Sequence, residues 1–213
     1  MAAPPPSRAE RAALCDLLLA VGPDAPTLCE GWTAADLAAH LLVREHNPLA
    51  GPGLVMGGAA AALTARITAR AKAAHAYDDL VARVRRGPPP WTAPFDAAIN
   101  TVEYFVHHED VRRGSGDLTP RPPDETVALD EALWHTLSRR SAFMTRPVGR
   151  TGLDLVRHDG AVIHARTGTP AATLTGRPGE IVLYLSGRGA AAHVEVGGPA
   201  DAAEAVRAAR FGV

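Results

Sequence analysis

A carboxylate and an imidazole lie one helical turn apart in the segment 94–113. Glu103 and His107 are four residues apart, so in a helix both side chains lie on one face and can reach the same ion. Apolar residues share this face, which is therefore expected to be buried. Buried carboxylates and imidazoles need partners, and a metal ion is one such partner.

A third candidate ligand, His40, lies in the middle of the apolar segment 34–47. In a bundle of helices it is expected to point at Glu103 and His107 across the core. Two histidines and one glutamate leave coordination positions open, which is typical of a catalytic Zn²⁺ site rather than a closed structural one. Fe²⁺ can use the same set, so the spacing leaves the metal open. A buried, metal-free hydrogen-bonded triad is a further reading.

Four charged residues are candidates for supporting roles around these ligands. Asp36 and Asp110 lie within one turn of a ligand histidine and are predicted to accept hydrogen bonds from imidazole N–H groups. Arg44 and Arg188 are candidates to hold a substrate carboxylate, with a surface arginine as the simpler reading of each.

The remaining histidines and the two cysteines carry no motif that points to chemistry. His108 is expected to lie at the surface because its side chain points away from Glu103 on the helix. Cys15 and Cys29 are expected to be small core residues and neither a disulfide nor a metal pair.

The elements that must position these residues follow from hydrophobic periodicity and from Gly and Pro breaks. Capping boxes are predicted at Ser7 with Glu10 and at Thr33 with Asp36. An α+β protein is expected, with a helical bundle over 1–146 and a small α+β domain over 147–213. The predicted helices are 7–21, 34–47, 59–86, 94–113, 124–144, a short one after Pro178, and 199–211, and the predicted strands are 153–157, 162–166, 172–175 and 192–196.

Composition excludes several classes of function. The 213 residues hold 22 basic and 23 acidic side chains, a formal net charge of -1, which argues against nucleic acid or an anionic membrane as the main partner. The N-terminal residues lack the apolar run of a secretory signal, and no stretch is apolar enough to span a membrane. A cytoplasmic protein is therefore expected.

Three stretches resemble a known family. The residues from Cys29 to Leu41 resemble the G-W-(S/T)-x-x-D-L-x-x-H-L motif of the DinB-like proteins, in particular the actinobacterial branch that includes mycothiol-dependent maleylpyruvate isomerase. The run from Val102 to Arg113 resembles an actinobacterial metal-binding subgroup, and Leu174 to Gly198 resembles the sterol-carrier-like domain that follows the helical bundle in the isomerase.

This resemblance implies a fold, a metal and a co-substrate. It implies a four-helix bundle followed by the small α+β domain, and a divalent metal held by His40, Glu103 and His107. Zn²⁺ is favoured, with Fe²⁺ and Ni²⁺ as alternatives, and mycothiol is implied as thiol co-substrate. The expected function is a metal- and thiol-dependent isomerase or S-transferase acting on a small electrophile. Alternatives are a metal-dependent hydrolase of the same fold and a non-catalytic metal-binding or ligand-sensing protein. Substrate and oligomeric state stay open.

Overall fold

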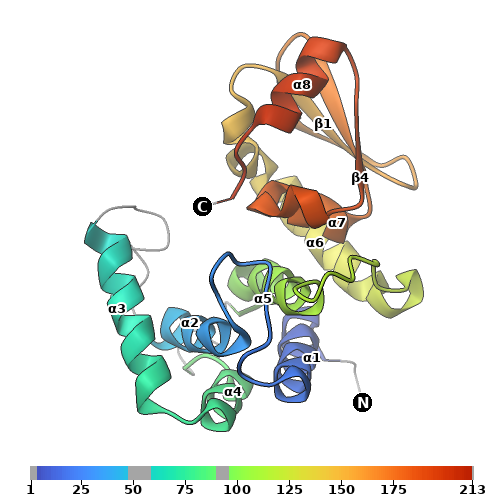
Figure 1. Ribbon diagram of the computed structural model, residues 1–213. Helices are drawn as coiled ribbons and strands as arrows, with labels where there is room; N and C mark the ends of the chain where they lie inside the picture. The colour runs from blue at the N-terminus through green and yellow to red at the C-terminus, as the bar shows by residue number, and fades with distance from the viewer. Residues whose placement is uncertain (1–3, 48–58, 90–95, 213) are drawn as a thin grey trace. The chain divides into compact units, whose positions relative to one another are not determined.

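The computed structural model describes residues 4–47, 59–89 and 96–212 (Figure 1). The chain divides into two compact units, Met1–Asp117 and Leu118–Val213. Over the described residues it holds eight α-helices and one four-stranded sheet, which confirms the predicted α+β class. Among these residues, no helix has the length and apolar character needed to cross a membrane.

The first unit is entirely helical in its described part. Its helices are α1 (Pro6–Val21), α2 (Ala34–His46), α3 (Ala59–Ala74), α4 (Tyr77–Arg86) and α5 (Asp96–Arg112). Helix α1 packs on α4 and α5, whereas α2 packs on α3 and α4. Over its described residues the unit therefore holds five helices, one more than predicted there, because the single helix predicted over 59–86 is interrupted.

The interruption lies at residues 75–76, between α3 and α4. Ala76 has an extended backbone (ψ 152°), and a new helix begins at Tyr77 with Asp78 and Asp79 in its first turn. Acidic residues there interact favourably with the helix dipole. The Tyr77 hydroxyl donates to the carbonyl oxygen of Leu18 at 2.7 Å, which ties the new helix to α1.

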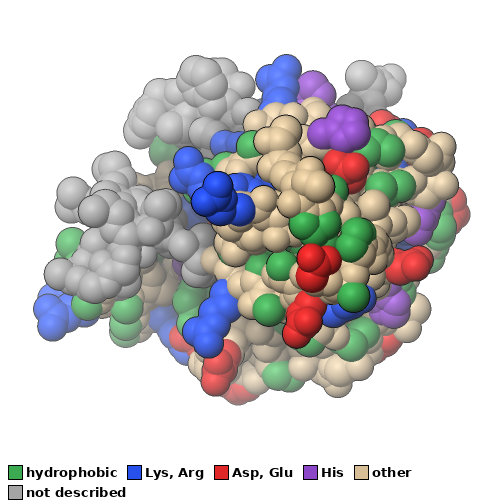
Figure 2. Space-filling model, turned by 90° about the horizontal axis from the view of Figure 1, so that it is seen from above, with side chains coloured by type: hydrophobic (Ala, Val, Ile, Leu, Met, Phe, Trp, Pro, Cys, Tyr) green, Lys and Arg blue, Asp and Glu red, His purple; other side chains and the backbone are tan. Residues whose placement is uncertain are grey.

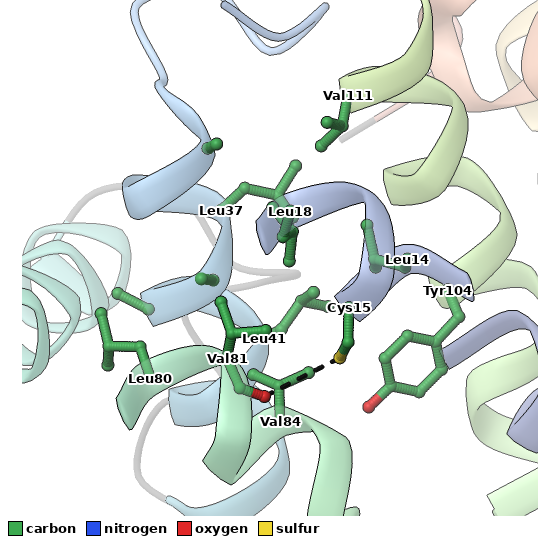
Figure 3. Packing of buried hydrophobic residues seen from close by; sticks show 13 residues of the cluster. Leu14, Cys15, Leu18, Leu37, Leu41, Leu80, Val81, Val84, Tyr104 and Val111 are labelled. Atoms are coloured by element: carbon green, nitrogen blue, oxygen red, sulfur yellow. Dashed lines mark hydrogen bonds between the residues drawn. The ribbon is translucent and has the colours of Figure 1, made fainter. Parts of the chain in front are cut away.

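The core of the first unit joins α1, α2, α4 and α5. Figure 3 shows leucines of three helices pointing toward one another, with Tyr104 and Val111 approaching from α5. Cys15 lies in this core, as predicted, and its thiol donates to the carbonyl oxygen of Val81 at 3.8 Å. The labelled core residues are Leu14, Cys15, Leu18, Leu37, Leu41, Leu80, Val81, Val84, Tyr104 and Val111.

One of the two predicted capping boxes is present. At the start of α2, Asp36 accepts hydrogen bonds from both the backbone N–H and the hydroxyl of Thr33. The box predicted at Ser7 is absent, because α1 begins earlier, at Pro6, and Ser7 is a buried residue inside the helix. Glu10, its expected partner, contacts α5 instead.

The second unit combines a mixed sheet with helices. In order it holds α6 (Pro123–Met144), a 3-10 turn (Arg146–Val148), β1 (Gly152–Arg157), β2 (Val162–Arg166), β3 (Ala171–Gly176), α7 (Pro178–Leu183), short turns (Tyr184–Arg188 and Gly189–Ala191), β4 (Val194–Gly197) and α8 (Ala200–Ala208). The strand order is β2-β1-β3-β4, with β1 and β3 parallel and the other pairs antiparallel. Helices α7 and α8 pack on β3, and α6 packs on β2 and α7.

The unit boundary differs from the predicted one at 146/147. Helix α6 belongs to the second unit, where Asp130 accepts a hydrogen bond from the Gly179 backbone at the start of α7 and pairs with Arg177.

The surface carries charges of both signs. On the face shown in Figure 2, acidic, basic and histidine side chains lie among hydrophobic ones, and no single type covers this face.

Candidate metal centre

Three side chains from α2 and α5 converge in the first unit. The Nε2 atom of His107 lies 3.2 Å from Oε1 of Glu103, and Nε2 of His40 lies 3.5 Å from the same oxygen. One ligand atom of each residue lies within 4.8 Å of the other two. The structure thus brings together the three residues that the sequence singled out as candidate ligands.

These distances fit the edges of a metal coordination shell. Zn²⁺ binds imidazole nitrogen and carboxylate oxygen at about 2.0–2.2 Å, so neighbouring ligands of a tetrahedral site lie about 3.3 Å apart. The two measured distances to Glu103 Oε1 fall on either side of that value. Both histidine side chains are nine-tenths buried, whereas that of Glu103 is one-quarter exposed, so the donor set has an open side. The residues present therefore fit a divalent cation.

Asp110 fixes the orientation of the His107 ring. The Nδ1 atom of His107 lies 2.9 Å from Oδ2 of Asp110, a fully buried carboxylate one turn further along α5. A carboxylate that accepts a hydrogen bond from Nδ1 keeps the ring proton on Nδ1, so that Nε2 is free to face Glu103. Metal-bound histidines commonly have such a hydrogen-bond partner on their second ring nitrogen. The hydrogen bond predicted for Asp110 is therefore present.

Cys29 also approaches Asp110, and the sequence reading missed it. Its thiol donates to the same Oδ2 atom at 3.1 Å, and Cys29, His107 and Asp110 form a second group of donors within 4.8 Å. Cys29 is partly exposed and lies outside the core, so the prediction of a small core residue is wrong for it. Its position just before the Gly31-Trp32 motif was the one sequence feature that could have pointed to a role near the candidate ligands.

The loop between α1 and α2 covers one side of the centre. The Leu28 backbone N–H donates to the Asp110 carbonyl oxygen at 2.9 Å. The ring of Trp32 lies 5.0 Å from that of His40, centroid to centroid, and the two histidine rings meet edge to face at 5.2 Å. Trp32 therefore packs beside α2 and restricts the orientation of the His40 ring.

Arg44 adds a positive charge to the centre. Its Nε lies 3.0 Å from Glu103 Oε1, and its Nη1 donates to the Asn100 side-chain oxygen at 2.5 Å. Asn100 in turn donates to Glu45, which also pairs with Arg11 of α1. This chain of contacts across α1, α2 and α5 holds the guanidinium against the candidate ligand.

The surroundings set the charges of the three candidate ligands. Burial lowers the pKa of His40. Burial opposes ionisation of Glu103, but hydrogen bonds from His107 and His40 outweigh it and hold the pKa of Glu103 well below its usual range. Burial likewise opposes protonation of His107, but the bonds to Asp110, Cys29 and Glu103 raise its pKa well above the usual histidine value. Without a cation, these contacts thus favour the protonated form of His107 between the two carboxylates.

Three expectations about individual residues need correction or stay open. Asp36 does not act on a histidine in the described structure: its oxygens are taken by Thr33 and by Lys72 Nζ at 2.7 Å, so it is a helix-capping residue. His108 is buried, not at the surface, because α5 is covered on both sides. Arg188 lies in the second unit, where it donates to the Ser186 carbonyl oxygen, and its role toward a substrate stays a prediction.

Comparison with known proteins identifies the fold. No family model and no curated protein sequence matches the chain. The crystal structure of the mycothiol-dependent maleylpyruvate isomerase matches it with a TM-score of 0.58 and 19% sequence identity, over 90% of each chain. The chain shares this fold. A histidine-to-alanine mutant of that isomerase matches with a TM-score of 0.57 and 17% identity, also over 90% of each chain. The likeness is one of fold, so the chemistry must be argued from the residues.

Proposed function

We propose that this protein is a metal-dependent isomerase or S-transferase: it uses a low-molecular-weight thiol, such as mycothiol, either to isomerise a small electrophile or to form a thioether with it. The observation that carries the proposal is the convergence of His40 Nε2, His107 Nε2 and Glu103 Oε1 on one point with an open side. The fold supports it, because two solved structures that share the fold are of a mycothiol-dependent isomerase. The family resemblance of the motif around His40 points the same way.

His40, Glu103 and His107 would hold the cation, with Zn²⁺ the best match to two imidazoles and one carboxylate. When bound, such a cation supplies Lewis acidity and stabilises a coordinated thiolate at neutral pH. Asp110 keeps the proton on Nδ1 of His107 and so presents Nε2 to the centre. Trp32 and the buried surroundings of the histidines limit the access of water from the side of the loop.

Arg44 supplies the positive charge that an anionic reactant needs. Its guanidinium is fixed by Glu103 and Asn100, so binding an anion there requires little further ordering. We propose that it stabilises the carboxylate of a substrate or the negative charge that develops on it during attack by the thiolate. In isomerisation, the thiolate adds to one carbon of an activated alkene and the π electrons move onto the activating group; after rotation about the resulting single bond, these electrons return and expel the thiolate. In transfer, the carbon–sulfur bond forms as the bond to a leaving group breaks, and that group departs with the electron pair.

The deciding experiment measures metal content by mass spectrometry on tag-free protein, with His107→Ala as the matched variant. We expect about one Zn²⁺ per chain, lost in the variant. Protein loaded with Co²⁺ is then titrated with mycothiol, and a change in the cobalt absorption spectrum is expected.

Each other outcome selects a different reading. A wild-type protein that folds normally and holds no metal contradicts the enzyme proposal and supports a hydrogen-bonded triad. Metal binding with a cobalt spectrum that thiols leave unchanged contradicts thiol dependence, and leaves a hydrolase or a non-catalytic metal-binding protein.

A further inference from the structure

One carboxylate oxygen links the candidate metal centre to the loop before α2. Oδ2 of Asp110 lies 2.9 Å from His107 Nδ1 and 3.1 Å from Cys29 Sγ. Asp110 is fully buried, so water does not satisfy this oxygen. The position of the oxygen depends on protein groups from two elements, the helix α5 and the loop.

The thiol itself is held by its loop. The backbone N–H of Cys29 donates to the hydroxyl oxygen of Thr27 at 3.1 Å, and that hydroxyl donates to the Trp32 carbonyl oxygen at 3.0 Å. The loop also lies directly against the end of α5: a Cβ atom at Gly114 would lie 2.2 Å from the carbonyl oxygen of Pro26. Glycine at this position lets loop and helix approach closely enough for the thiol to reach Asp110.

We infer that Cys29 is a positioning residue of the metal centre, acting on His107 through Asp110 and through its own proximity to the ring, since its Sγ lies within 4.8 Å of a His107 ring nitrogen. The thiol holds Oδ2 in the direction of the His107 ring, and the ring in turn presents Nε2 to Glu103. The inference rests on the metal site proposed above, and it assigns to Cys29 neither coordination of the metal nor contact with the substrate. Such outer partners commonly set ligand orientation and metal affinity.

The chain contains a matched control in its other cysteine. Cys15 is fully buried in the core of the same unit and donates to the Val81 carbonyl oxygen, and it belongs to neither of the potential metal-binding groups among the described residues. Removing its thiol creates a small cavity and lowers stability, but leaves the Asp110 contacts in place. An effect on metal binding through general loss of packing would thus show in Cys15→Ala as well.

The first test is the Zn²⁺ affinity of the full chain, measured by competition with a chromophoric chelator. In Cys29→Ala we expect affinity to fall about tenfold, the lower end of the range for outer partners. Cys29→Ser retains a donor and should stay within about twofold of wild type, as should Cys15→Ala. Equal affinity in Cys29→Ala and wild type overturns the inference while leaving the metal site intact. A wild type without measurable Zn²⁺ binding would instead overturn the proposed function.

Two spectroscopic measurements separate positioning from other roles. In metal-free protein, the Nδ1 proton of His107 should give a solvent-protected NMR signal in wild type and Cys29→Ser. It should exchange faster with water in Cys29→Ala; equal protection in all three overturns the inference without reference to metal. In Co²⁺-loaded protein, a near-ultraviolet thiolate-to-cobalt band that disappears in Cys29→Ser would show direct ligation and also overturn it.

Discussion

Two consecutive histidines of α5 occupy different kinds of polar cluster. His107 and His108 are equally buried, and each has its Nδ1 atom less than 3 Å from a carboxylate oxygen. The other ring nitrogen of His107, Nε2, lies close to Glu103 and to the side chain of His40. His108 contacts Glu10 of α1, and its ligand atoms belong to none of the potential metal-binding groups among the described residues.

The contrast shows that burial beside a carboxylate does not make a functional site. The His108–Glu10 pair joins two helices and satisfies two buried polar groups, which is a structural role. The His107 cluster adds convergence: donors from α2 and α5 face one point, and an outer carboxylate orients one of them. Replacing each histidine and its carboxylate partner tests this difference.

The largest difference is expected when each histidine is replaced by alanine. His107→Ala should lose stoichiometric metal, since removing a ligand costs more than the roughly 10–100-fold that loss of an outer partner costs. His108→Ala should keep metal affinity but lose about 1–3 kcal/mol of unfolding free energy, because the buried contact between His108 and Glu10 is removed. Chelator competition and urea unfolding measure the two effects. Loss of metal from both variants at matched stability would remove the distinction.

The carboxylates behind the two histidines should differ in the same way. Asp110→Asn is expected to weaken metal binding by roughly 10–100-fold, because the amide no longer holds the His107 ring as a carboxylate does. Glu10→Gln, the matched change behind His108, should leave metal affinity unchanged and affect stability alone. If Glu10→Gln weakened metal binding as much as Asp110→Asn does, the effect could not be assigned to orientation of His107.

The stability of metal-free protein should depend on pH through the His107 cluster. The raised pKa of His107 gives stability that is complete below the usual histidine value of about 6.5 and is lost as pH rises through the raised value. The lowered pKa of Glu103 gives stability that is present above its usual value and is lost as pH falls through the lowered one. The lowered pKa of His40 acts against stability as pH falls below about 6.5. Unfolding free energy should thus be highest near pH 6.5, to within about one unit, and decline toward alkaline pH.

Urea unfolding of chelator-treated protein across the pH range measures this pH dependence of stability. His107→Gln should lack the alkaline decline, and His108→Gln should keep it. Saturating Zn²⁺ should reverse the trend on the alkaline side, because the cation replaces a proton on the imidazole and binds better as pH rises. If His107→Gln lost as much unfolding free energy at alkaline pH as wild type does, the loss would have to come from another titrating group.

Much of the fold follows from local patterns in the sequence. The α6 helix, the first three strands and the short helix after Pro178 begin within about two residues of their predicted positions, because periodicity and Gly or Pro breaks mark them. The break at residues 75–76 was missed, because the alanine-rich sequence there is compatible with a continuous helix and tertiary contacts of Tyr77 favour the break. The unit boundary was missed because the sequence of α6 does not show which elements the helix packs against.

Contacts within α5 were accessible from spacing, whereas contacts across long stretches of sequence were not. Glu103, His107 and Asp110 are related by helix geometry alone. Cys29 reaches Asp110 from 81 residues away through the loop before α2, and Glu10 reaches His108 from 98 residues away, so neither contact has a spacing signal. His108 was expected at the surface because a helical wheel describes one buried face, while α5 is buried on both sides.

The smallest effect is expected at Asp36, the acidic residue one turn before His40. Asp36→Ala removes the acceptor for Thr33 and the pair with Lys72, and should cost about 1 kcal/mol of unfolding free energy through the weakened start of α2. Metal affinity should stay unchanged, in contrast to Asp110→Asn, because Asp36 contacts capping partners and not an imidazole. Thr33→Ala provides the matched control, since it removes the hydroxyl from the same capping box. If Asp36→Ala weakened Zn²⁺ binding while Thr33→Ala did not, Asp36 would have to act on His40, and the two carboxylates would share one role.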